Sequence, residues 1–210
     1  MSSTSSKTML HPTRIDIPAD IRIQVIELLN ESLAYTLDLK TQVKQAHWNV
    51  KGLDFYQLHQ LFDEMAGELE EYIDMVAERV TALGGVAMGT ARVAAAVSTL
   101  PEYPFDILAG KDHIVALADR YAPFAKLIRD GIEKTDDLGD ADTADLYTEI
   151  SRSIDMRLWF LEAHLQADEM AIAPTNGKAS TAKTTTKTAA KTAASKTATT
   201  KATTKKTKSK

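Results

Sequence analysis

Apolar residues recur every three or four positions along most of the first 170 residues, a spacing that places side chains on one face of a helix. The first such stretch runs from Asp20 to about Val50, where Gly52 can end a helix. A second runs from Asp54 to Leu83 without an internal proline. These stretches predict two long helices in succession.

The second half of the chain predicts two further long helices. Residues 88–98 are mostly small and form a long connection, which we expect to hold a short helix of its own. A third long helix should begin after Pro104, with Asp106 as its N-terminal cap and a kink at Pro123. The acidic turn 136–142 then opens the fourth.

These elements predict an all-α fold, because no stretch has a convincing strand pattern. Four long helices joined by mostly short turns favour a four-helix bundle, with a short extra helix in the connection between the second and third. We divide the chain into a flexible N-terminal arm (1–18), a helical bundle (19–170) and a disordered Lys/Ala/Thr-rich basic tail (171–210).

Charge separates the bundle from the tail. All 29 acidic residues precede residue 170, together with 15 of the 25 basic residues, so the body carries −14 and the tail +10. A flexible polycation binds phosphate backbones by releasing counterions, without reading base sequence. Solubilisation, or contact with anionic lipid or with the acidic body of another copy, is the alternative. The lysines predicted to bind DNA are Lys178, Lys183, Lys187, Lys191, Lys196, Lys201, Lys205, Lys206, Lys208 and Lys210.

Composition also limits the kinds of site and location. The 210 residues include no cysteine, which excludes disulfides and thiolate metal sites. The Ser/Thr-rich N-terminus has no apolar leader segment, and no apolar run approaches the length needed to cross a bilayer. We therefore expect a cytoplasmic protein without a membrane partner.

One stripe of the second predicted helix collects residues that bind metals. At about 100° per residue, His59, Asp63, Asp74 and Glu78 fall within an arc of roughly 100°. The His59/Asp63 pair nevertheless lies about 16 Å along the helix axis from the Asp74/Glu78 pair. One ion cannot bind both pairs, so a single chain would supply two half-sites.

A second, antiparallel copy could complete each half-site. A partner helix that crosses beside Gly67 would place His59 opposite the partner's Glu78, and Asp63 opposite the partner's Asp74. Mixed imidazole and carboxylate ligands suit iron, manganese or zinc better than magnesium or calcium. A surface histidine beside a solvated acidic face is the alternative reading of the same stripe.

The residues around this stripe resemble those of a known family. The run from Lys44 to Gly52 (KQAHWNVKG), followed by the metal-ligand stripe, resembles the Dps family of mini-ferritins, the DNA-binding proteins from starved cells. The likeness covers roughly Ile21 to Ala167. Further motifs that carry it are Phe62-Asp63-Glu64, Ala77-Glu78-Arg79, Tyr103-Pro104, Ala118-Asp119-Arg120-Tyr121 and Leu158-Trp159-Phe160-Leu161-Glu162.

This resemblance implies a ferritin-like bundle that assembles into a hollow dodecamer. It implies a di-iron ferroxidase centre formed by His47, His59 and Asp63 of one subunit and by Asp74 and Glu78 of its two-fold mate. The implied activity is oxidation of Fe(II), preferentially by hydrogen peroxide, with storage of ferric mineral and protection of DNA in the nucleoid. Zinc or manganese could substitute for iron.

Other acidic residues could handle iron outside that centre. Asp142 and Asp145 resemble the carboxylates of the family's pore through which iron enters, and Asp137 and Asp140 belong to the same segment. Aspartate also favours a helix N-terminus, so a solvated helix start explains them equally well. Carboxylates on the second helix that could nucleate mineral are Glu64, Glu68 and Glu71.

Two other functions are compatible with the sequence. The first is a nucleoid-compacting DNA-binding protein with little ferroxidase activity, although all five ligand positions are intact. The second is a zinc- or manganese-binding shell without oxidation. Trp48, next to His47, could pack against the metal site or quench stray oxidising equivalents.

Overall fold

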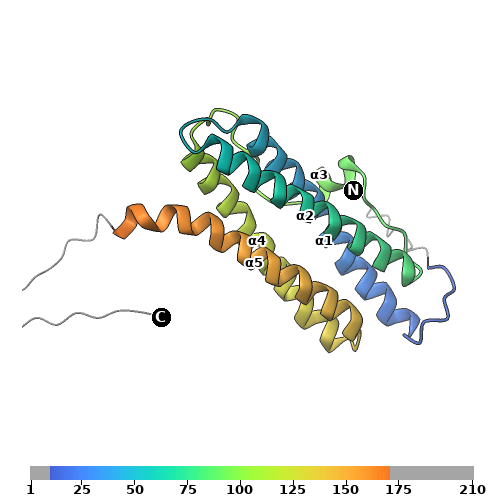
Figure 1. Ribbon diagram of the computed structural model, residues 1–210. Coiled ribbons are helices and arrows are strands. Elements are labelled where there is room, and N and C mark those ends of the chain that lie inside the picture. Colours follow the sequence, from blue (N-terminus) through green and yellow to red (C-terminus); the bar gives the residue numbers. More distant parts are fainter. Residues whose placement is uncertain (1–9, 171–210) are drawn as a thin grey trace, which may run out of the picture. The chain divides into compact units, whose positions relative to one another are not determined.

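The computed structural model describes residues 10–170, which form five helices and no strand. α1 packs along α2, and α4 packs along α5 (Figure 1). An isolated bridge joins Lys51 to Ala109, and Pro123 lies inside α4 as predicted. The prediction of a four-helix bundle with a short extra helix is confirmed. The helices are α1 (Ala19–Asn49), α2 (Phe55–Ala82), α3 (Ala91–Val97), α4 (Gly110–Asp137) and α5 (Ala141–Met170).

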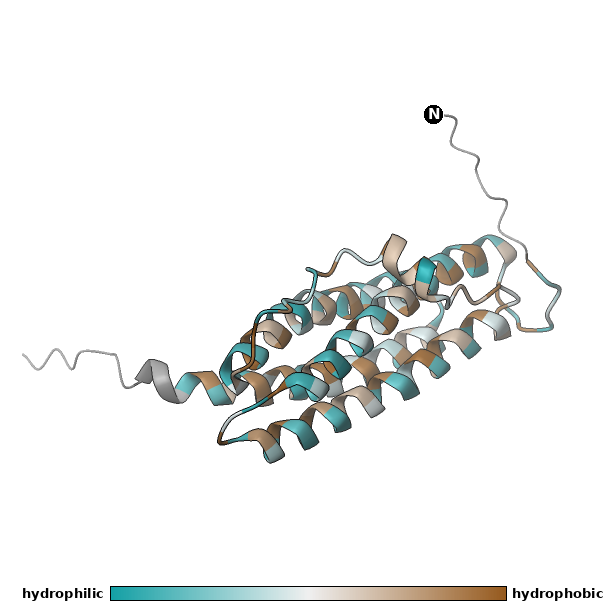
Figure 2. Cartoon of the chain, turned by 90° about the horizontal axis from the view of Figure 1, so that it is seen from above, coloured by the Kyte–Doolittle hydropathy of each residue, from teal (hydrophilic) through white to brown (hydrophobic). Residues whose placement is uncertain are grey.

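The apolar stripes of the four long helices meet in one core. Phe62, Met65 and Leu69 of α2 and Tyr121 and Phe124 of α4 are all at most 1% exposed. Figure 2 shows apolar positions along the sides on which the helices lie against one another. Burying each such side chain stabilises the fold by about 1.5–3 kcal/mol. None of the helices in residues 10–170 has both the length and the hydropathy needed to cross a membrane.

The predicted start of the third long helix is wrong. α4 begins at Gly110, and Asp106 lies in the preceding loop, so Asp106 does not cap the helix. The cap position is Ala109, whose side chain makes no capping hydrogen bond. The loop is instead held by the backbone of Lys51, which donates to the carbonyl of Leu108 at 3.0 Å. This bond keeps the loop extended up to the first turn of α4.

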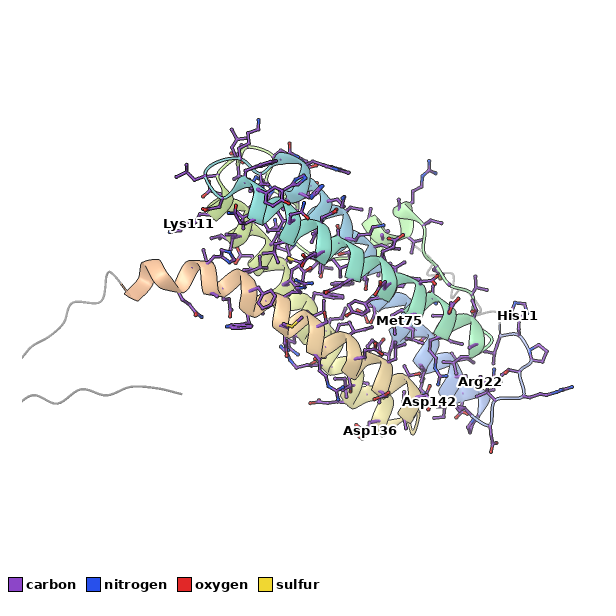
Figure 3. All side chains as sticks on the ribbon, in the orientation of Figure 1. His11, Arg22, Met75, Lys111, Asp136 and Asp142 are labelled. Atoms are coloured by element: carbon purple, nitrogen blue, oxygen red, sulfur yellow. The ribbon has the colours of Figure 1, made fainter. Side chains whose placement is uncertain are left out.

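Residues 10–18 are tied to the end of α2. The backbone N–H of His11 donates to the carbonyl of Gly84 at 2.7 Å, and Arg22 donates to the carbonyls of Leu83 at 2.8 Å and Ile17 at 3.1 Å. Figure 3 shows His11 and Arg22 at the same end of the bundle. This part of the segment predicted to be a flexible arm is therefore anchored.

We expect Gly84→Ala to destabilise the fold more than Gly139→Ala does. Both glycines have a positive φ, +88° and +81°, so an alanine is strained by about 1–2 kcal/mol at either position. A Cβ at Gly84 would also lie 2.4 Å from the carbonyl oxygen of His11, whereas nothing lies within 4 Å at Gly139. Thermal denaturation at a fixed protein concentration measures the difference. Equal losses would contradict a structural role for the contact between His11 and Gly84.

Candidate metal centre

Two histidines join the end of α1 to the first turns of α2. Nδ1 of His47 lies 2.8 Å from the carbonyl oxygen of His59, and Nδ1 of His59 lies 2.8 Å from the carbonyl oxygen of His47. The two rings are stacked with their centroids 3.8 Å apart. The turn between the helices thus brings together two side chains that are twelve residues apart in sequence.

This reciprocal bonding fixes the tautomer of both imidazole rings. A carbonyl oxygen can only accept a hydrogen bond, so Nδ1 must carry the proton in each ring. Nε2 of each neutral ring is then left with a lone pair. A histidine that donates through one nitrogen to a carbonyl and offers the other nitrogen is the arrangement commonly found in metal sites.

Asp63 lies on the same side of this histidine pair. One of its carboxylate oxygens is 3.8 Å from Nε2 of His47 and 2.7 Å from Nζ of Lys44. The hydrogen bond from Lys44 lowers the pKa of Asp63 below its ordinary value. Three of the five predicted ligands are therefore neighbours within one chain, and the carboxylate is held ionised.

The sequence interpretation missed the contact that Lys44 makes with Asp63. Lys44 stands one helical turn before His47 and Trp48. Helix periodicity could therefore have predicted that Lys44 lies on the same face of α1 as these two residues. Its ammonium group lies 5.8 Å from the centre of the Trp48 ring. Trp48 itself is 66% exposed, and it lines the open surface beside Asp63 rather than the core.

Asp74 and Glu78 lie farther along α2, and both are exposed. Within residues 10–170 no group of three or more His, Asp or Glu side chains is arranged to hold a metal ion. Within the described residues, the histidine pair at the junction of α1 and α2 and the second acidic pair farther along α2 are therefore separate groups.

The surface between α1 and α2 is open at the position where a partner helix was predicted to cross. A groove of about 730 Å³ is lined by Lys44, Trp48, Asp63 and Gly67 among others. Gly67 is exposed, and a Cβ built on it would meet nothing within 4 Å. The backbone of α2 is thus accessible from outside the chain, next to a candidate ligand.

The C-terminal turn of α2, which carries Glu78, is fixed by Arg79. Its guanidinium donates to Asp140 at 2.6 Å and to the hydroxyl of Thr143 at 2.8 Å. Asp140 is only 2% exposed, and it also accepts from the backbone N–H of Thr143 at 3.1 Å, as an N-cap of α5 does. Asp140 is therefore a buried helix cap and not a free pore carboxylate, as the helix-start alternative for this residue predicts.

The other members of the acidic segment have exposed side chains. Asp142 has a side chain that is 87% exposed and lies 3.9 Å from Arg79. Asp137 and Asp145 are also exposed. Figure 3 places Asp142 and Asp136 toward the end of the bundle that also carries His11. Pore lining by Asp142 and Asp145 stays a prediction.

The ten predicted DNA-binding lysines, Lys178 to Lys210, lie outside the described residues.

Glu68 is engaged in an ion pair rather than available to nucleate mineral. It accepts from Arg157 and from the hydroxyl of Ser153, and Arg157 also reaches Glu64 at 3.3 Å. Burial acts to raise the pKa of Glu68, but the hydrogen bonds from Arg157 and Ser153 outweigh it, so the pKa lies below its ordinary value. Arg157, which is 7% exposed, thereby links α5 to α2.

This ion pair predicts that stability falls in acid. Because the pKa of Glu68 is lower when folded, its contribution is fully present above the ordinary value of 4.5 and is lost as the pH falls below it. The Glu68 side chain is 27% exposed, so we expect Glu68→Gln to cost about 1–3 kcal/mol at pH 7 and less in acid. Thermal denaturation of the wild type and of Glu68→Gln, at pH 7 and at a pH below 4.5, measures the difference in stability. The control Glu70→Gln, at a side chain 60% exposed, should cost under about 1 kcal/mol. A Glu68 variant with unchanged pH dependence would contradict the assignment.

Comparison with known proteins places the bundle among ferritin-like chains. A family model described as a ferritin-like domain matches residues 26–171. A DNA protection during starvation protein from Agrobacterium fabrum is 45% identical over 156 residues, which cover 74% of this chain and 96% of that relative.

Solved structures give the same result. DpsC from Streptomyces coelicolor is 34% identical with a TM-score of 0.72, and the match covers 77% of this chain and 95% of that chain. A Mycobacterium smegmatis Dps is 30% identical with a TM-score of 0.71, and the match covers 74% of this chain and 94% of that chain.

Proposed function

Taking as premise that the chain belongs to the Dps family of ferritin-like proteins, we propose that it oxidises Fe(II) and stores the ferric product inside a hollow shell of identical subunits. Membership of this family supports iron storage and DNA protection in general. We further propose that the shell has twelve subunits, that hydrogen peroxide is the preferred oxidant, and that the protein associates with DNA in the nucleoid.

The observation that carries the proposal is the reciprocal bonding of His47 and His59. It turns Nδ1 of both rings toward backbone carbonyls, so Nε2 is the nitrogen that each ring can offer to a metal ion, and Nε2 of His47 lies 3.8 Å from a carboxylate oxygen of Asp63. Fe(II) accepts such imidazole and carboxylate ligands. The partner's Asp74 and the partner's Glu78 would complete the site across a two-fold axis near Gly67.

The chemistry follows from pairing two irons. Each Fe(II) gives one electron to peroxide, so two Fe(II), one H₂O₂ and two protons yield two Fe(III) and two waters without releasing hydroxyl radical. We assign His47 with the partner's Asp74 to one iron, and His59 with Asp63 to the other. The partner's Glu78 would bridge the two.

Hydrogen peroxide should oxidise the bound Fe(II) faster than dioxygen does. Peroxide accepts two electrons in one step, which matches the two electrons that a pair of Fe(II) ions supplies. Stopped-flow absorbance with each oxidant, on protein sized by light scattering, measures the two rates. Faster oxidation by dioxygen would contradict the preference.

A shell that binds zinc or manganese without oxidation is the rival function. Titration of Fe(II), Zn(II) and Mn(II) without oxygen, followed by addition of peroxide, separates it. The ferroxidase proposal requires rapid oxidation of the bound Fe(II), and retention of bound Fe(II) after peroxide addition would support the rival.

DNA association is assigned to the basic tail, whose ten lysines carry no base-reading pattern. A nucleoid-compacting protein with little ferroxidase activity is the alternative. The two functions use different residues and can therefore be separated by substitution.

A further inference from the structure

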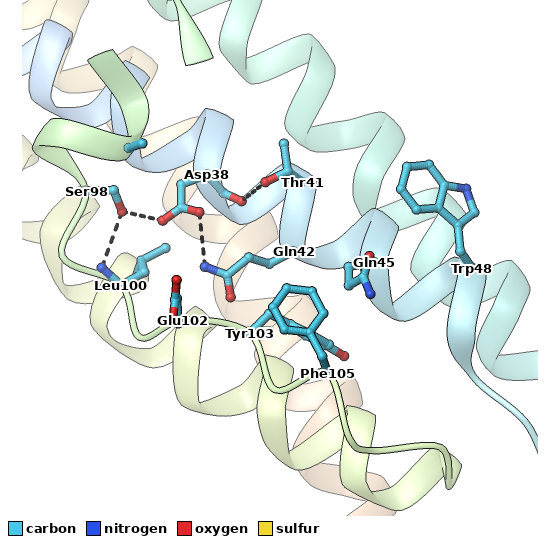
Figure 4. Close-up of a pocket in the computed structure, with 11 residues that line it drawn as sticks. Asp38, Thr41, Gln42, Gln45, Trp48, Ser98, Leu100, Glu102, Tyr103 and Phe105 are labelled. Carbon is cyan, nitrogen blue, oxygen red and sulfur yellow. Dashed lines mark hydrogen bonds between the residues drawn. The ribbon is translucent and has the colours of Figure 1, made fainter. Parts of the chain in front are cut away.

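A pocket beside α1 contains two carboxylates that the proposed iron chemistry does not use. It measures about 560 Å³, which is within the range of small-molecule sites. Asp38 comes from α1, and Glu102 comes from the loop between α3 and α4 (Figure 4). Helix periodicity presents the α1 contribution on one face. The residues that α1 supplies are Asp38, Thr41, Gln42, Gln45 and Trp48.

The charge of these two carboxylates is not cancelled by a neighbouring cation. One oxygen of Asp38 accepts from the hydroxyl of Ser98 at 2.6 Å, and the other accepts from the side-chain amide of Gln42 at 3.1 Å. Within residues 10–170, neither Asp38 nor Glu102 forms an ion pair with a lysine or an arginine. Neutral donors hold a carboxylate in place without removing its charge, so the pocket is negative.

Arg120 supports the wall of this pocket without lining it. Its guanidinium is buried, with only 5% of the residue exposed, and it donates to three neutral oxygens. These acceptors are the side-chain amide of Gln42 and the backbone carbonyls of Ala116 and Glu102. The bonds tie α1 and the loop to α4, so the two sides of the pocket are fixed before any ligand arrives, which lowers the entropic cost of binding.

Aromatic side chains supply the apolar part of the pocket. Tyr103 is buried, whereas Trp48 and Phe105 are 66% and 78% exposed. The face of an aromatic ring attracts a positive charge, and its surface packs against methylene groups. The ammonium of Lys44, which lines the neighbouring groove, already lies 5.8 Å from the centre of the Trp48 ring. Carboxylates next to aromatic faces therefore favour a cation with an apolar body.

The same features disfavour two other classes of ligand. Asp38 and Glu102 would repel a phosphate or a carboxylate, so the pocket does not suit a nucleotide or an organic acid. A metal ion would lack ligands, because the described chain brings no three His, Asp or Glu side chains together in a suitable arrangement. An organic cation is the class that remains.

We propose that this pocket binds an aliphatic diamine or polyamine. Each ammonium group offers three N–H donors to the carboxylate, hydroxyl and amide oxygens of the wall, and the methylene chain between two ammonium groups lies against the rings. Two carboxylates match the two charges of a diamine. Thr41 and Trp48 also line the groove proposed for the partner helix, but Asp38, Glu102 and Phe105 do not. The inference therefore does not rest on the proposed iron oxidation.

Isothermal titration of the assembled full chain with 1,4-diaminobutane, in the absence of iron, tests the proposal. We expect saturable binding at one site per chain. Two further probes separate charge from shape, since 1,4-butanediol keeps the chain length without charge and Mg²⁺ carries the same charge without methylene groups. Each should displace the diamine at least about tenfold less effectively. Equal displacement by Mg²⁺ would reduce the binding to a general attraction toward the acidic body and overturn the proposal.

Substitutions in the pocket locate the site. Glu102→Gln and Asp38→Asn each remove one charge at nearly constant shape, so each should weaken diamine binding by about tenfold or more. Phe105→Ala should weaken it about two- to fivefold. Asp106→Asn is the matched control, because it removes a charge next to Phe105 from an exposed side chain that does not line the pocket. Its affinity should equal that of the wild type.

The exposed position of Phe105 keeps the test independent of folding. Asp38→Asn changes two hydrogen bonds and could lower stability, whereas Phe105 is 78% exposed and its loss should leave the thermal denaturation of the chain unchanged. Unchanged diamine affinity in both Glu102→Gln and Phe105→Ala would overturn the proposal. If the diamine fails to bind while iron oxidation is normal, the pocket assignment fails and the proposed function stands. Diamine binding by a chain that oxidises no iron would give the opposite result.

Discussion

Two variants that are each inactive in iron oxidation should recover activity when they assemble together. One variant lacks the imidazole half-site (His59→Ala with Asp63→Asn), and the other lacks the acidic half-site (Asp74→Asn with Glu78→Gln). In a mixed dimer, one site receives both intact halves and the other receives neither. Random pairing makes half of the dimers mixed, so about a quarter of wild-type activity is expected.

Stopped-flow oxidation of Fe(II) by peroxide, after disassembly and reassembly of the two variants at equal concentration, measures the recovery. Each variant reassembled alone should lose at least about 10–100-fold in iron affinity, since even outer-sphere substitutions at metal sites cost that much. Glu70→Gln is the matched control, because Glu70 lies in the same groove but pairs with Lys40. An assembled mixture as inactive as its parents would show that the site is not shared.

Removal of residues 175–210 should abolish retardation of DNA in gels while leaving iron oxidation intact. The deletion removes ten lysines and no acidic residue, so the remaining body is strongly negative and should repel phosphate. Binding by the full chain should weaken steeply with salt, by about 0.9 logarithmic units per phosphate contact for each tenfold rise in salt.

A tail of the same length with every lysine replaced by glutamine is the matched control for that deletion. It should fail to bind DNA as the truncated chain does, because the loss comes from charge rather than from length. Undiminished DNA binding by either variant would place the interface on the bundle instead of the tail.

The parts of the fold that were predictable depend on local periodicity. The stripe from His59 to Glu78 follows directly from the helical repeat, and α2 is continuous from Phe55 to Ala82. The hydrogen bonds between each imidazole and the backbone carbonyl of the other histidine could not be predicted. They depend on the conformation of the turn between α1 and α2, which sets the position of α2 relative to the end of α1. No property of either residue alone fixes that geometry.

The start of α4 was misjudged for a related reason. Asp106 has the chemistry of a cap, but a cap is useful only where the backbone begins to coil, and the loop is held extended by a contact with Lys51. Asp140 illustrates the converse. Its side chain accepts from the backbone N–H of Thr143 and so caps α5, which is the helix-start alternative that the sequence had left open beside the pore.

The anchoring of His11 against Gly84 has a practical consequence for labelling. Residue 11 is held beside the start of α5, since the end of α2 contacts both. α5 is 30 residues long, so residue 170 lies about 45 Å farther along its axis. Fluorescent dyes attached near the two ends of the described chain would therefore sit at opposite poles of each subunit, and energy transfer between differently labelled copies could follow how the subunits come together.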